Sequence, residues 1–363
     1  MISVYYDYQI MLAQRFGGIS RYIYEISSRL KSLGADVKMR CIHNHNYYFS
    51  ESLGMYDTSK KSEIFRLSEL GIFHYVNKTA RSYDLMSGHY DIYHPTYYYA
   101  SKPERGKLIV TVHDMTHERY SGIYPVNKRV IEAKKNIIPK ADRIIAVSEN
   151  TKRDIINYYP EIKPDKISVI YHGASMKPEV NSSSPLKYDY ILFVGNRGMY
   201  KNFSRFSEAM KIIMRMYNDI HVFCAGGGNF TKEEVNSFGN FSSRFHQAAL
   251  SDNELSGAYE NALCFVFPSE YEGFGIPVLE AFACRCPVAC SNSSSLPEVS
   301  GDSVMYFDPS DIEDMSGAII NLIENPDLRR DLIVKGTERL KLFDWDMSAK
   351  KTLECYELAL KGE

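Results

Sequence analysis

The sequence predicts an α/β fold built from two doubly wound, Rossmann-like domains. The chain has 363 residues, which is more than one ordinary hydrophobic core accommodates. In both halves short apolar runs alternate with helical patterns, as expected for parallel sheets covered by helices. Residues 176–187 are rich in Ser, Pro and Lys and have the composition of a linker. We therefore predict a first domain at 1–180 and a second at 181–344, with ligand crevices facing each other across a central cleft.

Composition excludes several classes of function. Apolar residues make up 44% and charged residues 24%, as in a globular protein in water, and a net charge of −2 gives no indication of nucleic-acid binding. No apolar run approaches the ~20 residues that cross a bilayer, and the first residues carry no basic signal-peptide region. Seven cysteines form neither a disulfide framework nor a zinc-site spacing. These features predict a cytoplasmic protein with reduced core cysteines and no structural metal.

The elements of the first half follow in order. Strands are predicted where apolar runs end in polar turns, and helices where the apolar period is close to 3.6. The expected segments are a strand at 2–6, a helix at 22–30, strands at 37–42, 91–94 and 107–113, a basic helix at 129–140, and strands at 143–148 and 167–173. Residues 43–88 are irregular in pattern, with a helical stretch near 61–70.

The second half continues the same alternation. The expected strands are 190–195, 220–225, 264–267, 287–290 and 304–307, and the expected helices are 203–216, 251–261, 277–283, 311–324, 326–342 and 345–361. The segment 226–228 is Gly-Gly-Gly but lacks the Gly-x-Gly-x-x-Gly spacing of a dinucleotide site, because Phe230 and Thr231 occupy the later positions.

One stretch in the second half, residues 268–280, contains the strongest candidate for a ligand-binding site. A buried strand is followed by the turn Glu-Gly-Phe-Gly-Ile at 272–276, and Pro277 then sits where a helix begins. A helix N-terminus offers free N–H groups and a favourable dipole to an anion such as a diphosphate. Gly273 and Gly275 permit close approach of the backbone to such a ligand, and Glu272 and Glu280 flank the turn.

A second turn in this half also suits a diphosphate. After the strand at 190–195 come Arg197 and Lys201, followed by the helix that starts at Phe203. Two cations and free N–H groups at one helix N-terminus are a recurring anion site.

In the first half the signals are weaker. Gly17 and Gly18 mark a turn compatible with phosphate, and Arg21 is either a ligand for an acceptor or phosphate charge or a solvated helix residue. His94 and His113 both end strands, at the edge where ligands bind in α/β sheets. For His94 we favour a buried, hydrogen-bonded structural role, and for His113 a role in the site.

These motifs resemble a known family. Glu-Gly-Phe-Gly-x-Pro-x-x-Glu-Ala at 272–281, Cys-Pro-Val at 286–288, Leu-Pro-Glu at 296–298 and Gly-Asp at 301–302 look like the donor-site signature of retaining family 4 glycosyltransferases of the GT-B fold. The resemblance is strong over 190–310, moderate at 14–22 and 108–173, and poor over 43–88. One departure is Arg285, where the family commonly has Gly at the end of a helix.

The resemblance implies roles for individual residues. It implies that the donor diphosphate is bound by Arg197, Lys201, Gly18, Gly273, Phe274 and Gly275. It implies that Glu272 and His113 contact the transferred sugar, that Glu280 holds the ribose and that Leu250 lies near the base. On the acceptor side it places Gly17, Arg21 and Asp114. The resemblance also implies that the last helix, 345–363, crosses back onto the first domain. No cofactor and no metal ion is expected.

Three features stay open between two interpretations. The 28 tyrosines either supply sugar-stacking surfaces or reflect a compositional habit of the organism. The basic helix at 129–140 is a solvated face or a docking surface for an anionic membrane. Asp344 and Asp346 form an Asp-x-Asp pattern, for which we favour helix capping over metal binding.

We therefore expect a metal-independent, retaining hexosyltransferase that uses a GDP- or UDP-sugar, with GDP-mannose favoured. The expected acceptor is a hydroxyl of a lipid-linked oligosaccharide or surface polysaccharide, reached by peripheral contact with the inner face of the cell membrane. The alternatives are an epimerase or hydrolase of the same fold, and a non-catalytic protein that binds nucleotide sugars. The intact set of Glu272, Glu280, Arg197 and Lys201 favours catalysis.

Overall fold

The computed structural model describes residues 1–15, 17–41, 43–44, 46–48, 60–61, 70–123, 127–178 and 183–362. Contacts divide the chain into two compact units. Unit 1 comprises Met1–His172 with Trp345–Glu363, and unit 2 comprises Gly173–Asp344. The helical stretch predicted near 61–70 and the predicted boundary at residue 180 lie for the most part outside the described residues.

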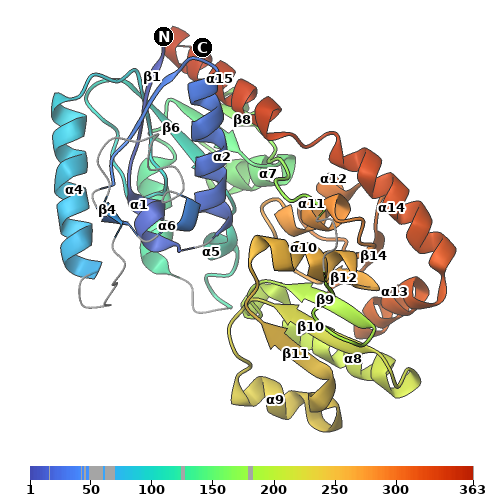
Figure 1. Ribbon diagram of the computed structural model, residues 1–363. Coiled ribbons are helices and arrows are strands. Elements are labelled where there is room, and N and C mark those ends of the chain that lie inside the picture. The colour runs from blue at the N-terminus through green and yellow to red at the C-terminus, as the bar shows by residue number, and fades with distance from the viewer. Residues whose placement is uncertain are drawn as a thin grey trace. The chain divides into compact units, whose positions relative to one another are not determined.

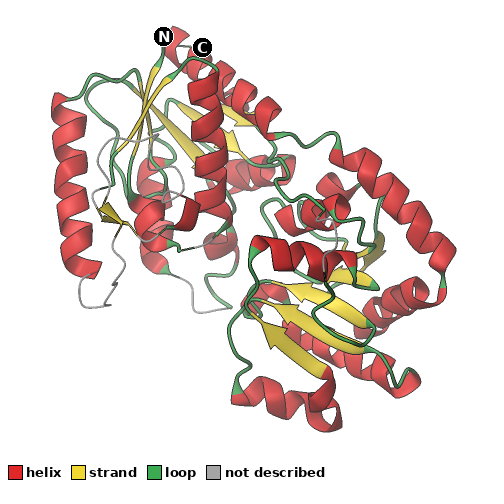
Figure 2. Ribbon diagram, in the orientation of Figure 1, coloured by secondary structure: helices red, strands yellow, loops and turns green. Residues whose placement is uncertain are grey.

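Unit 1 is a parallel sheet with helices on both faces (Figures 1 and 2). Its strands are, in spatial order, β2 (Asp36–Met39), β1 (Ser3–Tyr6), β5 (Ile92–His94), β6 (Lys107–Val112), β7 (Arg143–Ala146) and β8 (Ile167–Val169). Its helices are α1 (Gln9–Ala13), α2 (Gly18–Ser32), α4 (Leu70–Ser87), α5 (Thr116–Arg119), α6 (Lys128–Ile137), α7 (Glu149–Tyr158) and α15 (Trp345–Lys361). A separate two-stranded pair joins β3 (His43–Asn44) and β4 (Lys60–Lys61).

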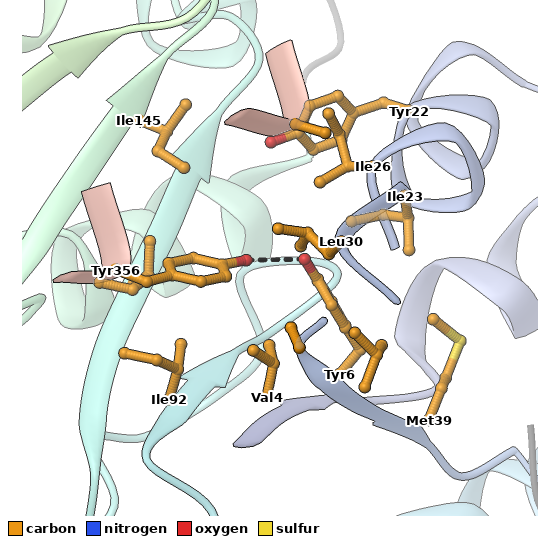
Figure 3. Close-up of a cluster of buried hydrophobic side chains, with 14 of the residues drawn as sticks. Val4, Tyr6, Tyr22, Ile23, Ile26, Leu30, Met39, Ile92, Ile145 and Tyr356 are labelled. Carbon is orange, nitrogen blue, oxygen red and sulfur yellow. Dashed lines mark hydrogen bonds between the residues drawn. The ribbon is translucent and has the colours of Figure 1, made fainter. Parts of the chain in front are cut away.

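The central strands β5 and β6 bury both faces and are largely apolar, whereas the edge strand β2 alternates and leaves Lys38 exposed. Side chains alternate along each strand, so Val4 and Tyr6 face α2 and α15 while Tyr5 belongs to the core on the opposite face. Figure 3 shows the first of these cores, in which the hydroxyl groups of Tyr6 and Tyr356 lie 2.7 Å apart.

The last helix, α15, is part of this core. Trp345 is 2% exposed and Tyr356 is fully buried, and the helix packs along α2. The prediction that the last helix returns to the first domain is thereby confirmed as a feature of the fold.

Unit 2 repeats the architecture. Its strands are, in spatial order, β11 (Phe245–Ala248), β10 (His221–Ala225), β9 (Tyr190–Val194), β12 (Cys264–Phe267), β13 (Val288–Ser291) and β14 (Met305–Phe307), all parallel. Its helices are α8 (Phe203–Met216), α9 (Lys232–Phe238), α10 (Asp252–Glu260), α11 (Ile276–Ala283), α12 (Leu296–Ser300), α13 (Ile312–Glu324) and α14 (Pro326–Leu340). The α/β prediction is confirmed in both units.

Some boundaries differ from the predictions. Helix α2 begins at Gly18 instead of residue 22, because Gly17 serves as its N-cap and the backbone is helical from there. Helix α14 ends at Leu340 instead of 342, and a short helix, α1, follows β1 where only a loop was expected. All seven cysteines are free and buried, as predicted.

The end of α11 carries a strained residue. Arg285 has φ +54°, in the left-handed region, and follows the C-cap Cys284. The N–H groups of Arg285 and Cys286 donate to the carbonyl oxygens of Phe282 and Ala281, which is the Schellman pattern that favours glycine at this position.

Replacing Arg285 by glycine is expected to stabilise unit 2 by about 1 kcal/mol, because glycine adopts positive φ without a Cβ clash. A gain of this size raises the melting temperature by roughly 2–4 °C for a unit of this length. Arg285→Ala is the matched control, since it removes the side chain but keeps the Cβ. Equal melting temperatures for the glycine and alanine variants would show that the backbone strain is relieved in another way.

Candidate active site

The candidate site of unit 2 lies at the carboxyl edge of its sheet, between β9 and β12. The chain passes from β9 to β10 on one side and later to β12 on the other, so these neighbouring strands form the topological switch point. Open α/β sheets bind ligands in the crevice at such a point. Glu272 follows β12 and Lys201 follows β9, so both lie at this edge.

The turn after β12 is built as predicted from the sequence. Gly275 is the N-cap of α11 with φ +110°, and Pro277 lies in the first turn of the helix. A Cβ at Gly275 would stand 2.8 Å from the Leu296 side chain, so both its φ and its surroundings require glycine. The turn therefore presents the N-terminus of α11 at the switch point.

Two serines hold this turn in place. Ser294 Oγ accepts from the Glu272 N–H at 2.8 Å and lies 3.1 Å from the Glu272 carbonyl oxygen. The fully buried Ser295 has its Oγ 2.9 Å from the carbonyl oxygens of both Glu272 and Phe274. Sequence analysis did not assign these serines a role, and the only signal was the serine-rich run 291–295.

The structure brings Lys201 and Glu272 together across 71 residues of sequence. Lys201 Nζ lies 2.6 Å from Glu272 Oε1, with the two side chains 22% and 13% exposed. The ammonium group also lies 5.2 Å and 5.7 Å from the ring centroids of Tyr200 and Phe267. A cation and a carboxylate are thus held beside the N-terminus of α11, both still accessible to a ligand.

Glu280 lies on α11 and is 7% exposed. Its Oε2 accepts a hydrogen bond from the Tyr259 hydroxyl at 3.3 Å. Burial and the neighbouring Glu280 carboxylate raise the pKa of Tyr259 well above its usual value, which keeps that hydroxyl protonated as a donor. The assignment of Glu280 to a ribose stays a prediction, and its carboxylate chemistry suits paired hydroxyl donors.

Arg197 has a different environment from Lys201, although the two share one turn. Its guanidinium is 4% exposed and donates to the carbonyl oxygens of Gly226, Gly228 and Asn229 at 2.9–3.0 Å. It also pairs with Glu234 at 2.9 Å. Arg197 therefore holds the glycine segment after β10, and its predicted role at a diphosphate stays a prediction.

Leu250 lies between β11 and α10 in the same unit and is partly exposed. Gly273 and Phe274 belong to the turn described above, and Phe274 is 4% exposed because its ring packs edge-on against Phe343 at 5.8 Å. Its contribution at a diphosphate would come from the backbone.

In unit 1 the glycine turn opens a helix. Gly17 caps α2 in an extended conformation, and the Arg21 N–H donates to its carbonyl oxygen at 3.0 Å. The Arg21 guanidinium lies 5.8 Å from the ring centroid of Tyr48. Gly18 is the first residue of α2, so the helix presents its N-terminal N–H groups at this turn.

His113 follows β6 directly. Its ring meets the buried Tyr22 edge-on at 5.1 Å, and its backbone N–H donates to the Tyr98 hydroxyl at 3.2 Å. Burial lowers the pKa of His113 to about 4; Asp114 opposes this shift and Lys134 adds to it. The imidazole is therefore neutral at pH 7 and offers one donor and one acceptor to a ligand.

Asp114 is ionised beside it. Burial by itself would raise the pKa of Asp114. The positive charge of Lys134, 3.8 Å away, and hydrogen bonds from Thr116 outweigh burial, and the net effect is a lowered pKa. Lys134 is 1% exposed and donates to the Asp114 carbonyl oxygen and to Glu118. The interpretation of α6 as an entirely solvated basic face is thus wrong for Lys134.

His94 has the structural role that sequence analysis favoured. It is fully buried, with Nδ1 2.7 Å from the Tyr356 hydroxyl and Nε2 2.8 Å from Thr111 Oγ1. Asp346, in the first turn of α15, accepts a hydrogen bond from Arg29 at 2.7 Å.

In the part of the chain that the structure describes, no three His, Cys, Asp or Glu side chains are grouped to hold a metal ion. No helix within the described residues has the length and hydropathy to span a membrane.

Two family models match consecutive parts of the chain. The model described as Glycosyltransferase Family 4 matches residues 16–177, and the model described as Glycosyl transferases group 1 matches residues 178–339. The second range contains Lys201, Glu272 and Glu280.

Relatives and solved structures agree with these matches. O-antigen chain mannosyltransferase B of Escherichia coli is 28% identical over 285 residues, covering 74% of each chain. O-antigen chain mannosyltransferase RfbU of Salmonella typhimurium is 30% identical over 223 residues, covering 60% of this chain and 61% of that protein. The structure of sucrose-phosphate synthase from Thermosynechococcus elongatus superposes over 100% of both chains with a TM-score of 0.76 at 18% identity, which shows a shared fold.

Proposed function

Since the chain belongs to the group 1 glycosyl transferases of the GT-B fold, we propose that this glycosyltransferase is a retaining enzyme that needs no metal ion. It transfers a hexose from a nucleotide-diphosphate sugar to a hydroxyl group of an acceptor. The anomeric configuration of the sugar is kept.

The contact between Lys201 and Glu272 carries this proposal. Loss of a nucleoside diphosphate develops negative charge on the leaving phosphate, and a preorganised cation beside a helix N-terminus stabilises that charge. Lys201 and the N-terminal N–H groups of α11 meet at the switch point of unit 2 and supply both elements. Glu272 would pass from Lys201 to the hydroxyl groups of the transferred sugar when the donor binds.

The same arrangement supports the proposed metal independence. Glycosyl transfer from a nucleotide sugar needs the leaving diphosphate neutralised, by a metal ion or by protein cations and N–H groups. The ammonium of Lys201, 2.6 Å from Glu272, is a protein cation that can take this role. Neutral His113 in unit 1 would donate to or accept from a hydroxyl of the sugar.

The names of the relatives support the choice of substrates. Two of them are O-antigen chain mannosyltransferases, which favours mannose as the sugar, GDP-mannose as the donor and a growing surface polysaccharide, carried on a lipid, as the acceptor. A UDP-sugar is the alternative donor. The apolar side chain of Leu250 itself cannot distinguish guanine from uracil by hydrogen bonding.

A panel of UDP- and GDP-sugars is expected to identify the donor by thermal shift. A ligand at 100 times its Kd stabilises a protein by about 2.7 kcal/mol. We expect a stabilisation of this size from either the UDP-sugars or the GDP-sugars, and we expect EDTA to leave it unchanged. Glu280→Ala should abolish the shift, while Glu233→Ala, which changes an exposed glutamate on α9, should preserve it. Glu280→Gln repeats the test with the shape of the side chain kept.

Other outcomes have clear meanings. A shift that EDTA abolishes and a divalent cation restores contradicts metal independence. Stabilisation without transfer to any acceptor favours a binding protein, and release of free sugar favours a hydrolase. Proton NMR of the transferred product reports its anomeric configuration, and an inverted product contradicts the retaining mechanism.

A further inference from the structure

Unit 1 contains a cavity of about 780 Å³ that has no role in the donor chemistry described above. It is lined by residues of α4, of α6 and of the segment that follows β5, and by Tyr8 (the two helices are labelled in Figure 1). All of the lining residues that the structure describes belong to unit 1.

The cavity lies at the topological switch point of the sheet. The chain passes from β1 to β2 on one side and later to β5 on the other, so β1 and β5 are the diverging neighbours. Tyr8 lies just beyond the carboxyl end of β1, and Tyr98 and Tyr99 lie just beyond that of β5. Unit 2 has its candidate site at the corresponding place between β9 and β12, and α/β sheets bind ligands there.

The lining is strongly cationic. Lys78 and Arg81 project from α4, and Arg129 and Lys140 come from α6 and the residues after it. None of the described lining residues carries a carboxylate. Burial and the charges of Lys78 and Arg81 lower the pKa of His74, which also lines the cavity, so its neutral form is favoured and it adds no positive charge at neutral pH. The two lysines and two arginines would attract an anionic ligand.

Arg81 is built into the wall. Its side chain is 13% exposed, and Nη1 donates to the Tyr99 carbonyl oxygen at 2.8 Å and lies 3.5 Å from Asp7 Oδ2. Its guanidinium also lies 5.8 Å from the ring centroid of Tyr8. Asp7 is fully buried and accepts hydrogen bonds from Thr96 and Tyr93. A positioned guanidinium in the wall of a cavity suits the oxygen atoms of a phosphate.

We propose that this cavity binds a phosphate or diphosphate group of the acceptor, an inference that rests on the proposed glycosyltransferase function. The tyrosine side chains beside the cations offer aromatic faces and hydroxyl groups to the sugar attached to that group. The cations from α4 and α6 thereby select an acceptor that carries negative charge. The phosphate belongs either to a lipid carrier or to a soluble sugar phosphate.

Isothermal titration with inorganic pyrophosphate tests the cavity itself when a saturating nucleoside diphosphate occupies the proposed donor site at Lys201. Each of Lys78→Ala, Arg129→Ala and Lys140→Ala is expected to weaken binding by about tenfold, because a charge-assisted contact is lost, and the triple variant by a hundredfold or more. These three residues are exposed, so the variants should fold, whereas Arg81 is left unchanged because buried Asp7 depends on it. Lys135→Ala is the matched control, an exposed lysine on α6 outside the cavity.

Unaltered pyrophosphate binding in the triple variant, or no measurable binding to the wild type, overturns the inference. An equal loss in Lys135→Ala overturns it as well, since net charge alone would then explain the effect. The nucleotide-induced thermal shift should persist in the triple variant. If pyrophosphate binding is specific but no nucleotide binds, the cavity assignment stands and the proposed function fails.

Two acceptor preparations distinguish the sources of the phosphate. One is phosphatidylcholine vesicles that contain an isoprenoid-diphosphate-linked sugar, and the other is a soluble sugar 1-phosphate. The triple variant should show a KM for the effective acceptor raised at least tenfold, with kcat at saturation nearly unchanged. An unchanged KM for both acceptors contradicts an acceptor role for the cavity.

Discussion

Replacing Lys201 by alanine is expected to lower kcat for sugar transfer by about 10²–10³-fold, the range found when one preorganised donor to developing charge is removed. The ammonium group has its largest effect as the diphosphate leaves, so kcat should fall more than donor affinity does. Lys211→Ala is the matched control, because Lys211 is also half of an ion pair, with Glu208 on α8 at 2.7 Å. Initial rates at saturating donor and acceptor make the comparison.

The contact between Lys201 and Glu272 allows a second test of the role of Lys201. Glu272→Gln keeps the shape of the side chain but removes the charge that Lys201 faces at 2.6 Å. If both side chains act on the same bond cleavage, the double variant should be little slower than the slower single variant. Wild-type kcat in Lys201→Ala removes Lys201 from the mechanism, and strictly additive losses place the two residues in separate steps.

Unit 1 is expected to lose stability as the pH falls from about 6.5 to about 4.5. Burial lowers the pKa of His94 to about 3 and that of His113 to about 4, with the charge of His113 adding to the shift at His94. The unfolded chain, with histidine pKa values near 6.5, binds protons in this window that the folded unit does not, so unfolding becomes more favourable as pH drops. At pH 4.5 the contribution of His94 is about 3 kcal/mol.

Thermal unfolding at pH 7.5, 6.5, 5.5 and 4.5 measures this effect. The melting temperature should be nearly constant above pH 7 and fall steadily below 6.5. Asp114, whose pKa is lowered, acts in the same direction but only near and below pH 4, outside this window. His94→Gln, which removes one of the groups, should show a shallower pH dependence than the wild type. A flat profile between pH 6.5 and 4.5 is inconsistent with buried neutral histidines.

The sequence is sufficient to predict the strands that bury both faces. Residues 190–194 and 264–267 are continuous apolar runs, and both are central strands of the second sheet. Strand β11 was not predicted because it lies at the edge of the sheet, where His246 and Gln247 are only partly buried and the run is not apolar. The other edge strands, β2, β8 and β14, were predicted, so it is the polar run of β11, and not its edge position alone, that hides it.

Sequence analysis named candidate site residues one by one, but it did not predict which of them contact each other. Lys201 and Glu272 meet because β9 and β12 are neighbours in the sheet. The order of strands in a sheet cannot be predicted from the local pattern of apolar residues. Arg197 and Lys201 share one turn, yet the first points into the glycine segment and the second toward Glu272. The left-handed conformation of Asn202 and the 3₁₀ turn at Met199–Lys201 decide these directions. Neither is apparent from residue type.

The return of α15 to unit 1 has a consequence for synthesis on the ribosome. Tyr6 and Tyr356 share a hydrogen bond across 350 residues, and Trp345 completes the same core. Unit 2 is one continuous segment, Gly173–Asp344, and all of its strands emerge before α15 does. Domains fold as units once their residues are available, so unit 2 can fold while unit 1 still waits for its last helix.

During that interval the face of α2 that α15 later covers is exposed. Tyr22, which is 1% exposed in the folded unit, lies on that face, and its ring centroid is 6.3 Å from that of Trp345. Apolar surface that is exposed during synthesis is a target for chaperones and a route to aggregation. A chain stalled before residue 345 would therefore hold a folded second unit and an incomplete first one, although the incomplete unit was synthesised first.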